Sequence, residues 1–237
     1  MPLPTIEVPK YKLKIPSSGK MVTYRPFLVK EEKILLTALE TSTDDGALTE
    51  ALVNLINSCI ITKGIDVESL PPFDLEYMFL QLRAKSVGET VEVEIKCKNK
   101  DCSLDKFPWE IDLTEMKIKK NKEHTNKIEL SAELGIIMKY PTMKNSYSLD
   151  IKNTDDIFNV IANCIDSIYT KEEVFSSKDH TKEEIESFIE QLSPEYFKKI
   201  ISFFETMPSM DNDVECTCPK CGEITNIGFR GIDDFFI

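Results

Sequence analysis

Seven cysteines stand in the 237-residue sequence, and most of them lie in two short clusters. The first cluster, "CKNKDC", holds Cys97 and Cys102; the second, "CTCPKCG", holds Cys216, Cys218 and Cys221. Cysteines separated by two to four residues are typical ligands of a structural zinc ion, which four thiolates bind as a tetrahedron. The clusters therefore predict a metal site, but the second cluster offers three cysteines for two ligand positions.

The alternation of the surrounding residues selects the ligands. In "VEVEIKC", apolar and charged residues alternate as in a half-buried strand, so Ile95 and Cys97 share the buried face. The stretch "VECTC" alternates in the same way, and aligning the two clusters places Cys218 with Cys97 and Cys216 with Ile95, a buried apolar position. We therefore predict a structural zinc ion bound by Cys97, Cys102, Cys218 and Cys221.

A site of this kind stabilises and does not catalyse, because four thiolates leave no open position for a substrate. Four free cysteines, or a rubredoxin-like iron centre of the same geometry, are the alternatives. Other catalytic chemistry has little support. The sequence has two histidines, His124 and His180, and it shows no phosphate-binding loop, nucleophile elbow or paired-histidine motif. We therefore expect a protein that is not an enzyme.

Composition and charge limit the function further. The chain is 41% hydrophobic and 30% charged, with a net charge of -12, which is typical of a soluble globular protein. An acidic body argues against general nucleic-acid binding, which depends on neutralising phosphates. A zinc-ribbon nucleic-acid-binding or transcription-associated protein is nevertheless the alternative function that the cysteines allow. No apolar run resembles a signal peptide or is long enough to span a bilayer, so we expect a cytoplasmic protein.

The elements that must position the cysteines divide the chain into five segments. Residues 1–26 contain five prolines and no helical period, which predicts an extended N-terminal arm that the rest of the fold does not need. A first helical repeat is expected at 27–90, and a β segment with the first zinc knuckle at 91–150. A second helical repeat follows at 151–210, and the second knuckle with an apolar C-terminal tail occupies 211–237.

Several details of these segments are specific. Short strands are expected in the arm on both sides of the turn "SSG", and "WEIDL" is expected to pair with "VEVEIKC". The stretch "TDDIFNVIANCIDSIY" keeps a helical period throughout, which predicts one continuous helix. Thr181, with Glu184, and Ser193, before a proline, are the expected N-caps of two later helices.

The two halves of the chain resemble each other. "LINSCI" at 55–60 corresponds to "VIANCI" at 160–165, and each is followed by a loop, a helix, an alternating strand and a cysteine pair. We infer a degenerate internal duplication. The predicted fold class is therefore α+β, a duplicated helical body whose β-hairpins form a split four-cysteine zinc ribbon, with an extended N-terminal arm.

The stretch "LPTIEVPKYKLKIPSSGKMVTYRPFLVKEEKILLTALE" resembles the N-terminus of the baseplate hub proteins of T4-type contractile-tailed bacteriophages. The shared features are the proline-rich lead, a Pro-Ser-x-Gly-Lys turn beginning at Pro16, and the block "YRPFLVKEEK" from Tyr24 to Lys33. The helical pattern and the late "CPKCG" knuckle also fit, so the resemblance extends along most of the chain.

This resemblance implies a non-enzymatic hub subunit or hub assembly protein that contacts other phage baseplate hub or tail proteins. It would work in the host cytoplasm during assembly and lie in the tail baseplate of the virion. The block suggests Tyr24, Arg25 and Phe27 as partner contacts, with Arg25 pairing to a local acid as the structural alternative. Phe235 and Phe236 of the apolar tail either fold back onto the helices or dock into a partner. The sequence does not fix the oligomeric state.

Overall fold

A computed structural model describes residues 7–41, 45–143, 154–210 and 212–229. The chain divides into two compact units. Unit 1 comprises Met1–Val67, Phe73–Lys119 and Ser209–Ile237, and unit 2 comprises Glu68–Pro72 and Lys120–Pro208. Unit 1 thus contains both predicted knuckle hairpins together with the arm and the first helices. None of the helices in the described part of the chain is long and apolar enough to cross a membrane.

Unit 1 begins with an antiparallel hairpin formed by β1 (Tyr11–Lys14) and β2 (Met21–Tyr24). The two strands flank the "SSG" turn, as predicted. The hairpin is not a free arm, because Leu13, Ile15 and Val22 are fully or almost fully buried. The backbone N–H and the hydroxyl of Ser17 also donate to the carboxylate of Asp74, which lies in the interior. The expectation of an extended arm that the fold does not need is therefore corrected for residues 11–24.

Three α-helices follow this hairpin among the described residues of unit 1: α1 (Val29–Thr41), α2 (Asp45–Cys59) and α3 (Pro72–Ser86). A short 3-10 helix, η1 (Val67–Ser69), precedes α3. Helix α3 is the central one, because its buried side chains are distributed around the whole helix. Helix α1 buries a narrow stripe that includes Leu35, whereas Ile34 is 60% exposed. Helix α1 therefore packs on one side and presents apolar side chains on the other.

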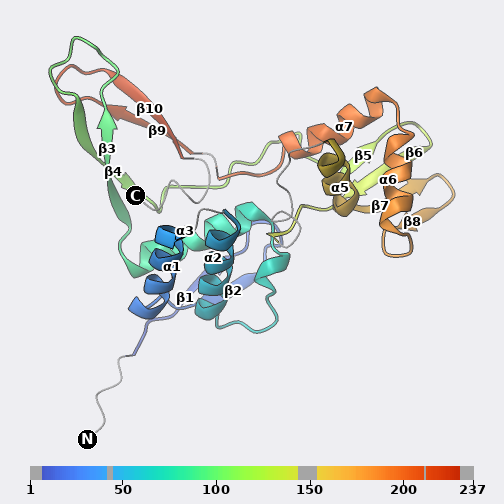
Figure 1. The fold of residues 1–237 in the computed structure, drawn as a ribbon, viewed down its shortest axis with the longest axis horizontal. Helices are drawn as coiled ribbons and strands as arrows, with labels where there is room; N and C mark the ends of the chain where they lie inside the picture. Colours follow the sequence, from blue (N-terminus) through green and yellow to red (C-terminus); the bar gives the residue numbers. More distant parts are fainter. Residues whose placement is uncertain (1–6, 42–44, 144–153, 211, 230–237) are drawn as a thin grey trace, which may run out of the picture. The chain divides into compact units, whose positions relative to one another are not determined.

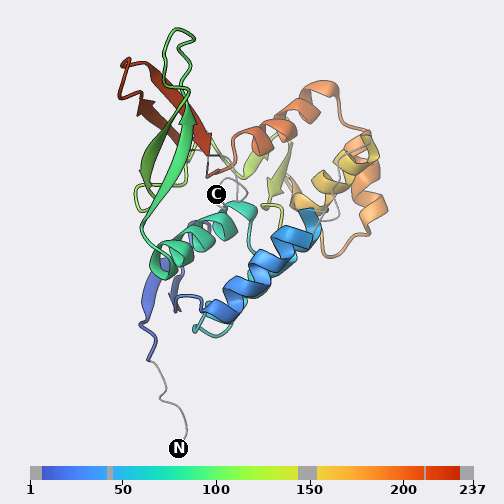
Figure 2. The same ribbon diagram turned by 60° about the vertical axis from the view of Figure 1, so that its left-hand side comes forward.

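Two hairpins complete unit 1 (Figures 1 and 2). Strands β3 (Thr90–Lys96) and β4 (Lys106–Asp112) pair antiparallel, with Val93 opposite Trp109 and Ile95 opposite Phe107. Strands β9 (Asn212–Thr217) and β10 (Ile224–Phe229) pair in the same way, with Cys216 opposite Thr225. The pairing of "VEVEIKC" with "WEIDL" is confirmed. Both views place the two hairpins side by side.

Unit 2 is built on an antiparallel sheet with the strand order β5-β6-β7-β8. Its strands are β5 (Lys127–Glu129), β6 (Leu134–Met138), β7 (Ile165–Thr170) and β8 (Val174–Ser176). Helices α5 (Thr154–Cys164), α6 (Lys182–Glu190) and α7 (Pro194–Glu205) supply the other half of its core. The buried side chains of sheet and helices form one continuous cluster, with Ile136, Ile165 and Ile200 fully buried.

The predicted caps and the predicted long helix have different outcomes. Thr181 caps α6 in a capping box with Glu184, and Ser193 caps α7 ahead of Pro194, as predicted. The continuous helix over "TDDIFNVIANCIDSIY" is wrong, because α5 ends at Cys164 and "IDSIYT" forms β7. Ile165 and Ile168 continue the helical spacing, but the structure pairs both with residues of β6. Only an extended strand can form these backbone hydrogen bonds to the sheet.

The junction between helix and strand is built alike in the two units. In unit 1 the N–H of Arg25 donates to the carbonyl of Cys59 (3.0 Å), where α2 ends, and in unit 2 the N–H of Lys139 donates to that of Cys164 (2.7 Å), where α5 ends. The next residue pairs antiparallel in each case: Ile60 with Tyr24, and Ile165 with Met138. The matching stretches "LINSCI" and "VIANCI" therefore adopt the same local structure.

Candidate metal centre

The first cysteine of each cluster follows the end of a strand. Cys97 comes directly after β3, and its N–H donates to the carbonyl of Asp105 (2.9 Å) across the loop. Cys218 comes directly after β9, and its N–H donates to the carbonyl of Glu223 at the same distance (2.9 Å). Cys97 and Cys218 are thus equivalent positions of two hairpins, which is the alignment inferred from the sequence.

The second cysteine of each cluster lies in the turn beyond. The N–H of Cys102 donates to the carbonyl of Asn99 (3.1 Å), which closes the longer first turn. In the tighter second turn, Gly222 directly after Cys221 has a φ of 73° and donates its N–H to the carbonyl of Cys218 (3.0 Å). A side chain at that φ is strained, so glycine suits this position. Each turn thus brings its second thiol back beside the first.

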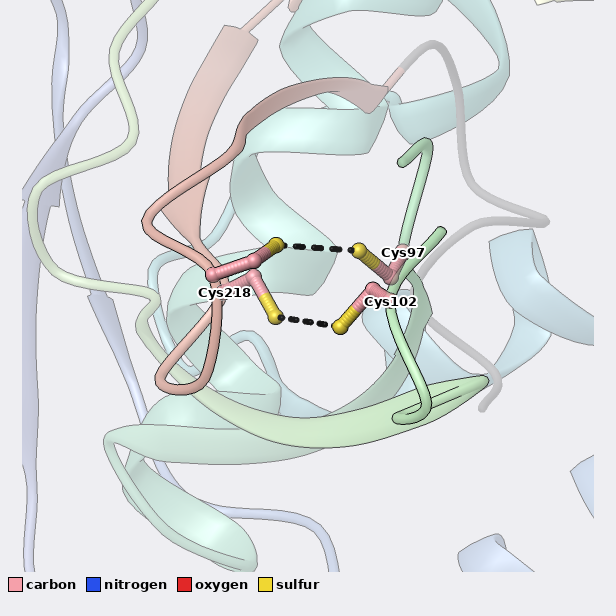
Figure 3. A group of neighbouring side chains, drawn as sticks. Cys97, Cys102 and Cys218 are labelled. Carbon is pink, nitrogen blue, oxygen red and sulfur yellow. Dashed lines mark hydrogen bonds between the residues drawn. The ribbon is translucent and has the colours of Figure 1, made fainter. Parts of the chain in front are cut away.

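The four thiols converge (Figure 3). The Sγ atoms of Cys97, Cys102, Cys218 and Cys221 all lie within 4.8 Å of one another. The closest approaches across the two hairpins are 3.6 Å between Cys97 and Cys221 and 4.0 Å between Cys102 and Cys218. Four sulfur atoms each about 2.3 Å from a tetrahedral zinc ion lie roughly 3.8 Å apart. Both the number of donors and their spacing therefore fit such an ion.

The protonation of the thiols differs within the group. The pKa of Cys218 is lowered to about 7, because backbone N–H groups of Cys221 and Lys220 donate to its sulfur. The pKa of Cys97 is raised to about 12, chiefly by burial. Metal ligation requires thiolates, so the backbone of the "CPKCG" turn prepares one of them. The ammonium of Lys220 also donates to the hydroxyl of Ser103, which joins the two turns beside the sulfur atoms.

The three remaining cysteines lie in apolar cores. Cys216 is fully buried within β9, and its Sγ lies 3.7 Å from the carbonyl of Val214. Cys59 and Cys164 are the last residues of α2 and α5, and burial raises the pKa of their thiols to about 11 and about 12. They are thus held as neutral thiols inside the protein.

The residues expected to contact a partner make contacts within unit 1, where the structure describes them. Tyr24 is 2% and Phe27 is 8% exposed, so both belong to the core of unit 1. The guanidinium of Arg25 donates to the buried carboxylate of Glu31 (2.9 Å) and to the carbonyls of Pro26 and Ser58. Arg25 therefore pairs with a local acid. Phe235 and Phe236 lie outside the described residues.

The histidines are not part of the cysteine group. His124 stacks against Tyr140 and Phe203 in unit 2, and both of its ring nitrogens are within hydrogen-bond distance of hydroxyl groups. His180 lies beside Glu184 at the start of α6. Sequence reasoning missed an apolar cavity near His180, because part of its wall comes from β7, where the spacing of the apolar residues had predicted a helix.

Comparison with known proteins supplies the family. No curated protein and no solved structure gives a significant match to the chain. A family profile, that of the T4 bacteriophage base plate protein, matches residues 8–237. This match includes the hairpin β1–β2, the helices of both units and all four converging cysteines, so it covers nearly the whole chain. The chain therefore belongs to the family of T4 bacteriophage base plate proteins.

Proposed function

We propose that this protein is a structural or assembly component of the tail baseplate hub of a contractile-tailed bacteriophage. It acts by contacts with other hub or tail proteins and carries out no chemical reaction. Membership of the base plate protein family carries this proposal. The specific assignment to the hub rests on the proline-rich lead and the "YRPFLVKEEK" block. Within that block Tyr24 and Phe27 are buried, whereas the side chains of Leu28 (39% exposed) and Val29 (78% exposed) are available to a partner.

We propose zinc as the metal bound by the four converging cysteines. The support is the donor set, four thiols within 4.8 Å of one another, together with the hydrogen bonds that prepare Cys218. Such an ion would join hairpin β3–β4 to hairpin β9–β10, which are more than a hundred residues apart in the sequence. Its role is then to hold the chain in its fold, because a closed thiolate site offers no position for a substrate.

The charges beside the knuckles favour this role over nucleic-acid binding. A nucleic-acid interface needs a continuous basic surface. Lys106 is paired with Glu94 (3.2 Å) across the first hairpin, and Lys119 with Asp213 (3.1 Å) at the base of the second. Each of these two basic side chains is therefore paired with an acidic one.

We also infer that the chain arose by duplication of a hairpin, a helical body and a terminal knuckle. The matching junctions at Cys59 and Cys164 support this inference, as does the equivalence of Cys97 and Cys218. In that case the proposed zinc ion joins the knuckle of one copy to the knuckle of the other. This explains why each hairpin supplies two of the four thiols.

The metal is tested with two cysteine variants only two residues apart. The purified protein is expected to contain one zinc ion per chain by mass spectrometry and no visible iron–thiolate absorption. Cys218→Ser should lose the metal, because three thiols remain. Cys216→Ala should keep one zinc ion per chain, since Cys216 lies in the strand. Zinc that survives Cys218→Ser, or is lost with Cys216→Ala, would overturn the ligand assignment.

The hub role is tested in the infected cell. An affinity-tagged copy of the chain should co-purify with baseplate hub proteins from cells lysed before tail assembly is complete. Quantitative mass spectrometry of mature particles then separates a virion subunit, present at a fixed copy number, from an assembly factor that has left. The proposal would be contradicted if the tagged chain co-purified with no tail protein and was also absent from mature particles.

A further inference from the structure

Unit 2 contains an apolar cavity of about 280 Å³ that the proposed function does not use. It lies between strands β6 to β8 and helix α6, and its apolar walls are Leu134, Ile165, Ile168, Phe175, Ile185 and Phe188. An apolar cavity of about 150 Å³ is large enough to bind benzene. This cavity therefore has room for at least one phenyl ring.

A polar cavity of about 220 Å³ adjoins the apolar one and shares Ser177, His180 and Ile185 with it. Its other walls include the exposed lysines Lys139 and Lys182. His180 and Lys182 lie 3.3 Å and 3.7 Å from carboxylates of α6, whereas Lys139 has no acidic partner among the described residues. The two cavities together suit a ligand with aromatic side chains next to acidic ones.

The sheet edge beside the cavity suits an extended chain. Strand β8 is the last strand in the order β5-β6-β7-β8. The N–H of Thr170 donates to the carbonyl of Glu173, and the N–H of Ser177 to that of Asp166, so alternate residues of β8 face β7. Val174, at an intervening position, directs its backbone groups away from β7, and its side chain is 69% exposed. A second strand could pair with this edge.

We propose that these two cavities bind the segment "RGIDDFFI", residues 230–237, of a second copy of this chain. The segment places Asp233 and Asp234 directly before Phe235 and Phe236. Side chains of an extended segment alternate between its two faces, so Asp233 and Phe235, or Asp234 and Phe236, would face the cavities together. The aromatic ring of that pair would enter the apolar cavity, and its aspartate would meet Lys139 or Lys182. When two copies exchange this segment reciprocally, both pairs of cavities are filled and the dimer is closed and symmetric.

A binding experiment with the full chain tests the cavities. The probe is a fluorescently labelled peptide of residues 230–237, and the readout is fluorescence anisotropy. The protein carries Phe235→Ser and Phe236→Ser, which removes competition from its own segment. Saturable binding is expected. Adding Lys139→Glu and Lys182→Glu should weaken it by about tenfold or more, because both charges are reversed. Lys178→Glu is the control, because Lys178 is an exposed lysine between β8 and α6 that lines neither cavity.

The outcomes separate the alternatives. A peptide that does not bind, or that binds equally well to the Lys139→Glu, Lys182→Glu variant, overturns the site. Sedimentation equilibrium of the unmodified chain then tests the second copy. A concentration-dependent dimer is expected, and it should disappear with Phe235→Ser, Phe236→Ser. A chain that stays monomeric while the peptide binds would mean that the segment occupies the cavities of its own molecule, which overturns the exchange between copies.

Discussion

At the scale of single residues, Cys216 and Cys218 show that the place of a cysteine in its hairpin decides whether its thiol joins the group of four. Both thiols are almost fully buried, at 0% and 1% exposure, so burial does not distinguish the thiol that joins the group of four from the one that does not. The register does. Cys216 is paired with Thr225 inside the hairpin, whereas Cys218 stands one residue beyond β9, where the turn begins. A thiol at the end of a strand can approach the other hairpin, and a thiol within the strand is held in the core.

Gly135 gives the first residue-scale prediction. It lies opposite Tyr169 in the sheet of unit 2, and a Cβ atom there would stand 2.2 Å from the ring of Tyr169. Gly135→Ala should displace the ring, which also lies 5.2 Å from the ammonium of Lys127, and lower the free energy of unfolding by about 2 kcal/mol.

Chemical denaturation measures this change, and a double-mutant cycle provides its control. In a Tyr169→Ala background the ring is gone, so Gly135→Ala should cost much less there. Equal costs in the two backgrounds would mean that the strain has another source.

His124 gives a pH prediction. Thr206 donates its hydroxyl proton to the carbonyl of Ser202 (2.7 Å), so Nδ1 of His124 donates to Thr206 (3.0 Å). Burial lowers the pKa of His124 below the ordinary 6.5 and so favours the neutral ring, whose Nε2 accepts from Tyr140 (3.0 Å). The unfolded state binds the proton more tightly, so the free energy of unfolding should fall as the pH drops below 6.5 and level off below the folded-state pKa.

Denaturation curves between pH 7.5 and pH 5 measure this slope. His124→Phe keeps an aromatic ring in the stack but cannot be protonated, so it should remove the contribution of His124 to the slope. His180→Gln removes the other histidine of the sequence from an exposed position and is the control. A slope that is unchanged by His124→Phe would assign the pH dependence to other groups.

At the scale of elements, hairpin β1–β2 is part of the core of unit 1. Deleting residues 1–20 would remove Leu13 and Ile15 and leave the buried carboxylate of Asp74 without Ser17. A buried polar group that loses its partner costs about 1–3 kcal/mol, in addition to the lost apolar burial. We expect this deletion to unfold unit 1, as seen by loss of the sharp amide dispersion of its residues in NMR spectra.

Deletion of residues 1–6 is the matched control for this experiment. It shortens the chain at the same end but keeps Leu13, Ile15 and the contact of Ser17 with Asp74. A folded unit 1 after deletion of residues 1–20 would restore the idea of a dispensable arm.

The hairpin also shows what the sequence could and could not predict at this scale. Its strands and turn follow from local signals, as do the caps at Thr181 and Ser193, because turns and caps depend on neighbouring residues. The burial of the hairpin does not follow from local signals, because it involves the contact of Ser17 with Asp74, 57 residues away. Strand β7 was missed for the same reason: Ile165 and Ile168 fit a helix, and the pairing with β6 decides otherwise. The grouping of Cys97, Cys102, Cys218 and Cys221 could be predicted, because cysteine spacing and strand alternation are local.

At the scale of the whole molecule, the chain leaves unit 1 after Lys119 and returns to it at Ser209, and two backbone hydrogen bonds join these residues. The four cysteines lie beyond this crossing, on hairpins from both sides of the intervening segment. The proposed metal ion on them would close a loop of more than a hundred residues that includes most of unit 2. Closing a loop of about 100 residues stabilises a fold by roughly 4–5 kcal/mol in the chain-entropy treatment.

Metal removal should therefore act on the two units unequally. Trp109, the one tryptophan of the sequence, lies on β4 against Phe107, so its fluorescence reports on the hairpins of unit 1. A zinc chelator should lower the melting temperature seen by Trp109 by about 10 °C or more, given a few degrees per kcal/mol. The melting transition of unit 2, followed through the NMR signals of His124, should keep its midpoint, because all four thiols belong to unit 1. Cys218→Ser should show the lower melting temperature without chelator and no further shift with it.

Two outcomes would contradict this prediction. Equal shifts of both transitions would mean that the metal stabilises the two units as one body. An unchanged Trp109 transition would mean that the thiols need no metal to hold the hairpins.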